Sequence, residues 1–233
     1  MSYQNYIFDL YGTLVDIKTN ENKTSLWKSL SFWYCMKGAE YSPIELKKNF
    51  QKKIQENENK LNCCFREIQI ELVFKALYED KGIAVTKREV CETGMLFRAL
   101  SLEYIKLFKG AKEVLIELKK RKKKMFLLSN AQNIFTEPEI HMLQIYPYFE
   151  GILLSSDAGV KKPSEQFYEQ LFKKYKLSKL ESVMIGNDSN ADIWGAADYG
   201  IDSRYIHTKQ SPEVVKTFPK NCIQINSLDQ LLI

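Results

Sequence analysis

Four short apolar runs constrain the fold of this chain most, because each ends abruptly in side chains that can do chemistry. The runs are residues 6–8, 125–128, 152–154 and 183–185, and they lead into Asp9, Ser129-Asn130, Ser155-Ser156-Asp157 and Gly186-Asn187-Asp188. Short apolar runs without alternation are typical of strands buried on both faces, as in a parallel sheet. Helical patterns at 111–120, 167–176 and 193–199 accompany the last three runs. The sequence therefore predicts the α/β class with a parallel sheet.

The polar groups that end these runs should lie close together. In open parallel sheets, ligands bind in the crevice outside the carboxyl ends of the strands. All four polar clusters follow such an end. We therefore expect one site, assembled from segments that are far apart in the chain.

The segment from Lys18 to Lys106 has a different pattern. Its apolar residues recur with a helical period over four stretches, which are Ser25–Met36, Pro43–Glu56, Asn62–Glu79 and Lys87–Leu107. We therefore expect an all-helical cap at residues 18–106, inserted into a catalytic core made of residues 1–17 and 107–233.

Two conspicuous groups of side chains are explained better by packing and helix electrostatics than by binding. Aromatic residues at helical spacing in the insertion favour a bundle core over a substrate pocket; they are Trp27, Phe32, Trp33 and Tyr34. The basic run at 119–124 follows a helical pattern, where cations suit the negative end of the helix dipole. We therefore expect no nucleic-acid partner, although a net charge of +5 would help to steer an anionic substrate.

Composition indicates a globular chain outside any membrane. Hydrophobic residues make up 45% of the 233 residues and charged residues 27%, which are ordinary values. No run of about twenty apolar residues is present, and residues 6–8 are too short for a signal-peptide core. The five cysteines are odd in number, and Cys63-Cys64 lacks metal-ligand spacing. We expect reduced thiols, a cytoplasmic location and no membrane partner.

Asp9 is the candidate nucleophile. It follows a predicted strand and precedes Gly12, which permits a tight turn, and Thr13, which supplies a hydroxyl. A carboxylate is ionised at neutral pH and can attack without a base to activate it. Taken alone, an aspartate that caps a turn explains the pattern better. Ser129 and Asn130 add hydroxyl and amide donors suited to an oxyanion, and Lys161 or Lys162, just before Pro163, could neutralise charge.

A divalent cation is suggested by an excess of carboxylates. Asp188 and Asp192 lie four residues apart around a turn into a helix and could meet Asp9 across the crevice. Three carboxylates against one lysine leave a charge near minus two, which is costly unless a cation binds or one acid is protonated. Carboxylate oxygens suit Mg²⁺. A structural hydrogen bond at the helix start is the alternative role for Asp192.

At these residues the sequence resembles the haloacid dehalogenase-like hydrolase superfamily. Residues 8–16, 128–130, 162–163 and 186–192 are similar to its four motifs, in order and around an insertion after the first. The resemblance implies a Rossmann-like three-layer core, a helical cap and a covalent intermediate on Asp9. It also implies a catalytic set of Asp9, Tyr11, Ser129, Asn130 and Lys162, a substrate-binding set of Thr13, Ser129, Asn130, Lys162 and Tyr168, and Mg²⁺ ligands from Asp9, the Tyr11 carbonyl and Asp188.

Tyr11 departs from the pattern of the family's phosphatases. They usually carry an aspartate two residues after the nucleophile, where it protonates the leaving group. The family's dehalogenases resemble this chain in having tyrosine there and another tyrosine six residues after the lysine, which Tyr168 matches. A phenol with a pKa near 10 is a poor substitute for a carboxylate in proton transfer.

The fourth motif favours the opposite conclusion. The family's dehalogenases bind no metal and have no acid where this chain has Asp188, and no arginine for a halide lies between Lys18 and Phe65. Asn187 occupies the place of the commoner aspartate, so we take Asp188 as the ligand. The sequence thus predicts a Mg²⁺-dependent phosphatase of a small phosphorylated metabolite. A 2-haloacid dehalogenase and a phospho-ligand-binding protein without turnover are the alternatives.

Overall fold

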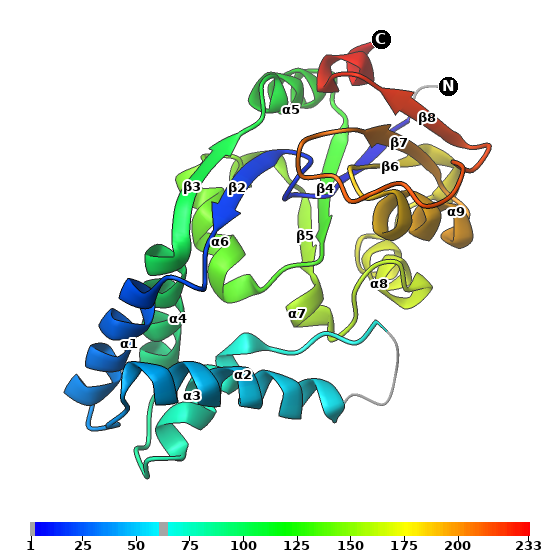
Figure 1. Ribbon diagram of the computed structural model, residues 1–233. Coiled ribbons are helices and arrows are strands. Elements are labelled where there is room, and N and C mark those ends of the chain that lie inside the picture. Colours follow the sequence, from blue (N-terminus) through cyan, green and yellow to red (C-terminus); the bar gives the residue numbers. More distant parts are fainter. Residues whose placement is uncertain (1–2, 61–64) are drawn as a thin grey trace.

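A six-stranded parallel sheet forms the centre of the computed structural model, which describes residues 3–60 and 65–233 (Figure 1). Its strand order is β5-β4-β1-β6-β7-β8. The strands span Asn5–Phe8 (β1), Lys124–Ser129 (β4), Gly151–Leu154 (β5), Ser182–Gly186 (β6), Asp202–Ile206 (β7) and Cys222–Ile225 (β8). The four apolar runs are β1, β4, β5 and β6, so the predicted parallel sheet is confirmed.

Helices cover both faces of this sheet because both faces are apolar. Along β1, Tyr6 and Phe8 belong to one hydrophobic cluster and Ile7 to another. The first cluster includes side chains from α5 (Ala111–Lys120), and the second includes side chains from α8 (Glu165–Tyr175) and α9 (Gly195–Tyr199). The result is the expected three-layer α/β core.

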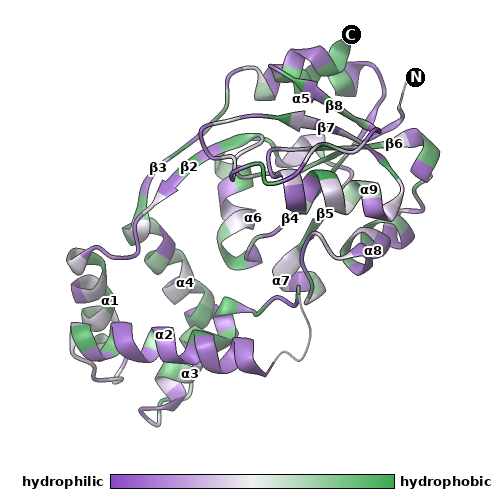
Figure 2. Ribbon diagram, turned by 45° about the vertical axis from the view of Figure 1, so that its right-hand side comes forward, coloured by the Kyte–Doolittle hydropathy of each residue, from purple (hydrophilic) through white to green (hydrophobic). Residues whose placement is uncertain are grey.

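Four helices lie to one side of the sheet (Figure 1). They are α1 (Thr24–Met36), α2 (Pro43–Asn59), α3 (Ile70–Glu79) and α4 (Lys87–Ser101), and they supply most of a further hydrophobic cluster. Figure 2 shows mostly hydrophilic residues along α2, whose buried side chains are Leu46 and Phe50. An antiparallel pair, β2 (Val15–Thr19) and β3 (Leu102–Leu107), joins these helices to the core.

Two helical stretches were predicted too long. The stretch at 87–107 ends as a helix at Ser101, because Leu102–Leu107 pairs with β2. Within the described residues, the helix predicted over 62–79 begins only at Ile70, and Cys63-Cys64 lies outside the described residues. The strands β7 and β8 and the helix α6 (Asn133–Met142) were not predicted at all. Pro138 interrupts the helical pattern of α6.

Short helices complete the chain between these elements. They are η1 (Tyr146–Tyr148), α7 (Ser155–Ala158), η2 (Lys179–Glu181), the π-helix η3 (Ser189–Trp194) and η4 (Leu228–Leu232). Of the insertion's aromatic residues, Trp27 and Tyr34 are buried in the bundle core, as expected, whereas Phe32 is exposed. The last turn of α5 carries Lys119 and Lys120, which places the basic run at a helix end.

Two further findings concern the state of the cysteines and the length and apolar character of the helices. The cysteines within the described ranges, Cys35, Cys91 and Cys222, are free thiols. Over those same ranges, no helix combines the length and apolar character that crossing a membrane requires.

Candidate active site

A cavity of about 160 Å³ opens at the carboxyl ends of β1, β4 and β6. Asp9, Ser129, Lys162 and Asp188 are among the side chains that line it. Each of these residues follows a strand or lies just before a helix. In a parallel sheet, polar groups gather at this edge because the carboxyl ends of the strands meet there. The structure therefore brings together the groups that the sequence placed at strand ends.

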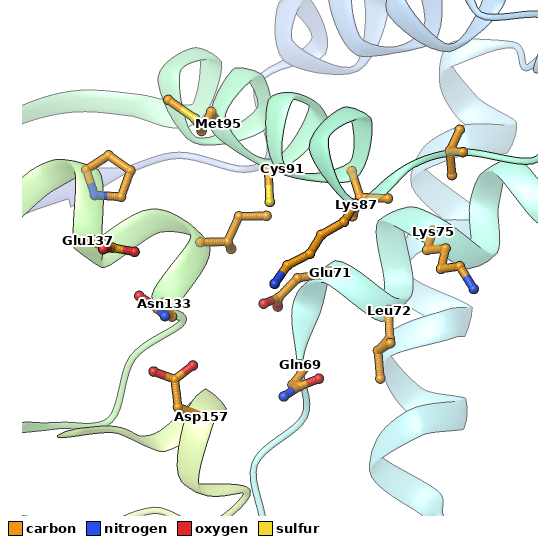
Figure 3. A pocket seen from close by; sticks show the side chains of 14 residues that line it. Gln69, Glu71, Leu72, Lys75, Lys87, Cys91, Met95, Asn133, Glu137 and Asp157 are labelled. Carbon is orange, nitrogen blue, oxygen red and sulfur yellow. The ribbon is translucent and has the colours of Figure 1, made fainter.

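A larger cavity of about 610 Å³ lies between α3, α4 and α6 and shares no lining residue with the first (Figure 3). Figure 3 shows Glu71 and Lys87 on one side of it and Asn133 and Asp157 on the other. None of the predicted site residues lines this cavity. The chemical character of the lining residues, rather than the volume of the cavity, therefore identifies the candidate site.

Asp9 is nearly buried and held by three donors. Ser129 Oγ donates to Asp9 Oδ1 at 3.0 Å, and Lys162 Nζ donates to the same oxygen at 2.7 Å. Oδ2 lies 3.2 Å from the hydroxyl of Thr13. Because Oδ1 accepts both the charged and the serine donor, Oδ2 is the oxygen more available for attack.

The turn after Asp9 requires glycine. Gly12 has φ of +87°, and a Cβ there would lie 2.5 Å from Nδ2 of Asn187. The Thr13 hydroxyl lies 3.2 Å from Asn187 Oδ1 as well as from Asp9 and donates to one of them at a time. Thr13 does not line the cavity. Its geometry supports positioning of Asp9 rather than the substrate contact expected from the sequence.

Lys162 uses its whole hydrogen-bonding capacity inside the protein. Its ammonium donates to Asp9 Oδ1, Asp192 Oδ1 and the Leu128 carbonyl, each at 2.7 Å, which accounts for its three protons. Burial opposes the charge, but Asp192 and Asp9 outweigh it and raise the pKa of Lys162. This lysine anchors the nucleophile rather than reaching toward a ligand.

Asn130 fixes the loop that carries the lysine. Its Oδ1 accepts from the Lys162 backbone N–H at 2.8 Å, and its Nδ2 donates to the Lys162 carbonyl at 3.1 Å. The neighbouring Lys161 donates its backbone N–H to the Phe65 carbonyl instead. The geometry thus distinguishes the two lysines, and Lys162 is the one directed at Asp9.

Asp192 lines the cavity and acts as a structural partner. Besides accepting from Lys162, it accepts the Asp188 N–H at 3.0 Å on Oδ2. Burial raises the pKa of its carboxyl. The three carboxylates therefore do not converge on one cation, because Asp192 is already paired with Lys162.

Asp188 caps the π-helix η3. Its Oδ1 accepts the N–H groups of Asn190 and Ala191 at 2.8 and 2.9 Å. Both bonds fall on one oxygen, so Oδ2 is left for another partner. In the described part of the chain, no three His, Cys, Asp or Glu side chains form a metal cluster by themselves. Asp9 and Asp188 in one cavity nevertheless fit Mg²⁺, which binds through one or two carboxylates and keeps several waters.

Two predicted site residues point elsewhere. The Tyr168 side chain is fully buried, and its hydroxyl lies 2.9 and 3.1 Å from the carbonyl oxygens of Ala191 and Asp192, which share its one hydrogen. It supports the backbone of η3 and does not line the cavity, so its expected contact with substrate is not what the structure has. Tyr11 lines the cavity, but its hydroxyl donates to Glu139 Oε2 and lies 3.0 Å from Thr136 Oγ1.

The groups around Tyr11 were missed by the sequence analysis. Glu139 of α6 accepts from Arg98 Nε of α4 at 2.6 Å, and the Arg98 guanidinium lies 5.9 Å from the centre of the Tyr11 ring. Burial first, and Glu139 second, raise the pKa of Tyr11. Another missed contact comes from the loop after β7, where Thr208 Oγ1 donates to the Gly12 carbonyl at 2.8 Å and Gln210 lines the cavity.

A family model for haloacid dehalogenase-like hydrolases matches residues 3–200. The chain belongs to this family. The match covers the segments that carry Asp9, Ser129, Lys162 and Asp188 and the inserted helices between the first two. The resemblance inferred from the four motifs is thus confirmed, and the protein is a hydrolase of this family.

Curated relatives of this haloacid dehalogenase-like hydrolase include phosphatases. A glyceraldehyde 3-phosphate phosphatase of Methanothermobacter thermautotrophicus is 23% identical over 139 residues, 59% of this chain and 62% of that protein. The human N-acylneuraminate-9-phosphatase is 23% identical over 226 residues, 96% of this chain and 90% of that protein. The chain therefore spans less than two thirds of the archaeal phosphatase but most of the human one.

Solved structures share the fold of this hydrolase. The 2-haloacid dehalogenase of Pseudomonas syringae pv. Tomato matches with a TM-score of 0.67 at 18% identity, over 99% of this chain and 96% of that one. The Bacillus subtilis HAD-hydrolase YfnB bound to magnesium matches with a TM-score of 0.58 at 18% identity, over 99% and 97% of the two chains. At such identities the likeness concerns the fold alone.

Proposed function

We propose that this protein is a Mg²⁺-dependent phosphatase of a small phosphorylated metabolite, with Asp9 as the nucleophile. The charge of the cavity is the observation that carries the proposal. Asp9, Asp188 and Asp192 line it against a single cation, Lys162, so its net charge lies between minus one and minus two, depending on whether Asp192 is protonated. An anionic substrate would be repelled from such a cavity unless a divalent cation accompanies it.

The chain's own residues support the reaction in two steps. Asp9 Oδ2 attacks phosphorus while Ser129 and Lys162 hold Oδ1, and the bond from phosphorus to the leaving oxygen breaks with its electron pair on that oxygen. Water then attacks the phosphorus, which releases phosphate and restores the Asp9 carboxylate. Asp9, the Tyr11 carbonyl and Asp188 would hold Mg²⁺, which offsets charge on the phosphoryl oxygens when bound.

Residues 18–106 act as the cap in this proposal, and residues 1–17 with 107–233 act as the catalytic core. The hydrophobic cluster of α1–α4 supports this division, because most of its side chains come from those four helices. The cap would select the substrate, and Ser129 and Asn130 would face its anionic group from the core side.

A 2-haloacid dehalogenase is the second candidate, favoured by Tyr11 at the second position after the nucleophile. A screen of phosphorylated metabolites and 2-haloacids, each with Mg²⁺ and with EDTA, separates the two. The proposal expects phosphate release that needs Mg²⁺ and is absent in Asp9→Asn. Chloride release from 2-chloropropionate in EDTA would contradict the phosphatase proposal and support the dehalogenase function.

A further inference from the structure

The side chains around Asp9 determine which protons the cavity can donate to a substrate. Among the residues that line it, the side chains with a hydrogen on oxygen or on a charged nitrogen are Tyr11, Ser129 and Lys162. Neither histidine of the chain, His141 or His207, lines it. Whether a substrate's leaving group can be protonated here depends on what these three groups already bind.

Tyr11 directs its proton away from the nucleophile. Its hydroxyl is bonded to Glu139 Oε2, and Glu139 is fixed in turn by the buried ion pair with Arg98. An ionised carboxylate only accepts hydrogen bonds, so the phenolic hydrogen lies on the Glu139 side. Tyr11 lines the cavity, but its proton is committed to Glu139 of α6.

The other two groups are committed as well. All three protons of Lys162 are donated to Asp9, Asp192 and the Leu128 carbonyl. Ser129 donates its hydroxyl hydrogen to Asp9. Asp192 acts as an acceptor, toward Lys162 on one oxygen and toward the Asp188 N–H on the other. Within the described residues, the cavity therefore offers no side chain that is free to protonate a leaving group.

We propose that this enzyme is specific for phosphoryl groups whose leaving group departs as a stable anion, such as acyl phosphates and aryl phosphates. This inference rests on the proposed phosphatase function. Carboxylic acids have pKa values near 4 and phenols near 10, whereas an aliphatic alcohol is as weak an acid as water, about 15.7. Carboxylates and phenolates leave with their electron pair and no proton, while alkoxides require one. In the second step, the attacking water keeps its two protons on the released phosphate, so that step needs no protein acid.

A leaving-group series tests the inference. The full chain with Mg²⁺ is assayed on acetyl phosphate, p-nitrophenyl phosphate, phenyl phosphate and ethyl phosphate, and kcat/KM is compared with the pKa of the leaving group. General acid help is worth about 10²–10⁴-fold. We therefore expect kcat/KM on ethyl phosphate to lie at least about 100-fold below that on p-nitrophenyl phosphate.

A substitution at Tyr11 provides the second part of the test. Tyr11→Asp places a carboxyl group in the cavity and should raise the ratio of ethyl phosphate to p-nitrophenyl phosphate activity at least about tenfold. Tyr11→Phe, which supplies no acid, should leave the slope of the series as in the wild type. The wild-type series decides the inference even where a variant does not fold.

Two results would overturn the inference, and they differ in whether the proposed phosphatase function survives. A wild-type kcat/KM on ethyl phosphate within about tenfold of that on p-nitrophenyl phosphate would show that a proton donor acts in the cavity, and the phosphatase function would stand. Failure to hydrolyse any phosphate in the series, acetyl phosphate included, would remove the phosphatase function together with the inference.

Discussion

Lys162 is the residue on which the geometry of the site depends. Its ammonium is almost completely buried and bridges Asp9 and Asp192, with both carboxylate oxygens at 2.7 Å. A buried cation of this kind balances charge that the protein has already desolvated. Removal of the lysine would leave two buried carboxylates facing each other without a counter-ion.

Replacement of this lysine should therefore destabilise the fold as well as the site. Lys162→Met should lower the free energy of unfolding by about 3–5 kcal/mol, the usual loss when one partner of a buried pair is removed. Lys161→Met is the matched control, because the Lys161 contact with Phe65 uses the backbone, and it should change stability by less than about 0.5 kcal/mol. Urea unfolding of both variants measures the difference. Equal losses would show that the ion pairs do not stabilise this core.

Part of this residue-level arrangement was predictable. Asp9 and Ser129 lie at strand ends, so the parallel topology alone brings them together, and Lys162 comes from the loop before α8, directly ahead of Pro163. The partners of Tyr11 were not predictable, because Arg98 and Glu139 lie on the faces of two helices and Glu139 is 128 residues away in sequence. The place of Tyr168 was not predictable either, since a buried tyrosine that supports a backbone turn has the same spacing as one that touches a ligand.

At the scale of elements, the N-terminus of α4 is fixed by a reciprocal pair of hydrogen bonds. The Thr86 hydroxyl accepts from the Glu89 N–H, and the Glu89 carboxylate accepts from the Thr86 N–H and also pairs with Lys37 of the segment after α1. Such a capping box predicts the start of a helix from sequence. The helix end was less predictable, because residues 102–107 become a strand through pairing with Val15–Thr19, and that pairing is not local.

The capping carboxylate makes α4 sensitive to acid. Hydrogen bonds from the Thr86 backbone and hydroxyl, and then from Lys37, lower the pKa of Glu89 from 4.5 to about 2. A group whose pKa is lowered by folding contributes stability above its unfolded pKa, and that contribution is lost as the pH falls through its folded pKa. At pH 6 the free energy of unfolding of the wild type should therefore be higher than that of Glu89→Gln. This difference should disappear as the pH falls from 4.5 to 2. A difference that stays constant over this range in urea unfolding would refute the assignment.

At the scale of the whole molecule, two contacts in the described residues join the insertion to the core besides the packing of α4 on α6, where Arg98 pairs with Glu139. The β2–β3 pair forms one connection. The second is the segment just before α3, where Glu67 accepts from Ser155 and Gln132, and the Ile70 N–H donates to Gln132. The residues that line the site cavity come from outside the insertion. The four inserted helices were visible in the sequence, but these contacts were not, since they join polar side chains that carry no periodic signal.

Metal binding should be visible in the stability of the whole molecule. A ligand that binds only the folded state raises stability in proportion to the logarithm of its concentration. Millimolar Mg²⁺ should raise the melting temperature of the wild type, and Asp188→Asn should abolish the rise because it neutralises one of the two carboxylates assigned to the ion. Asp229→Asn, in the C-terminal helix η4, is the control and should keep the full rise. A rise of the same size in Asp188→Asn would contradict the assignment.

Direct detection of a phosphoryl group on Asp9 tests the central claim of covalent catalysis. The enzyme is mixed with Mg²⁺ and acetyl phosphate labelled in its phosphoryl group, quenched in acid within one turnover, and digested for mass spectrometry. Wild type should carry the label on the peptide that contains Asp9, and Asp9→Asn, folded and nearly isosteric, should carry none and turn nothing over. Steady release of labelled phosphate by the wild type with no label on that peptide, or turnover by Asp9→Asn free of aspartate, would contradict the claim.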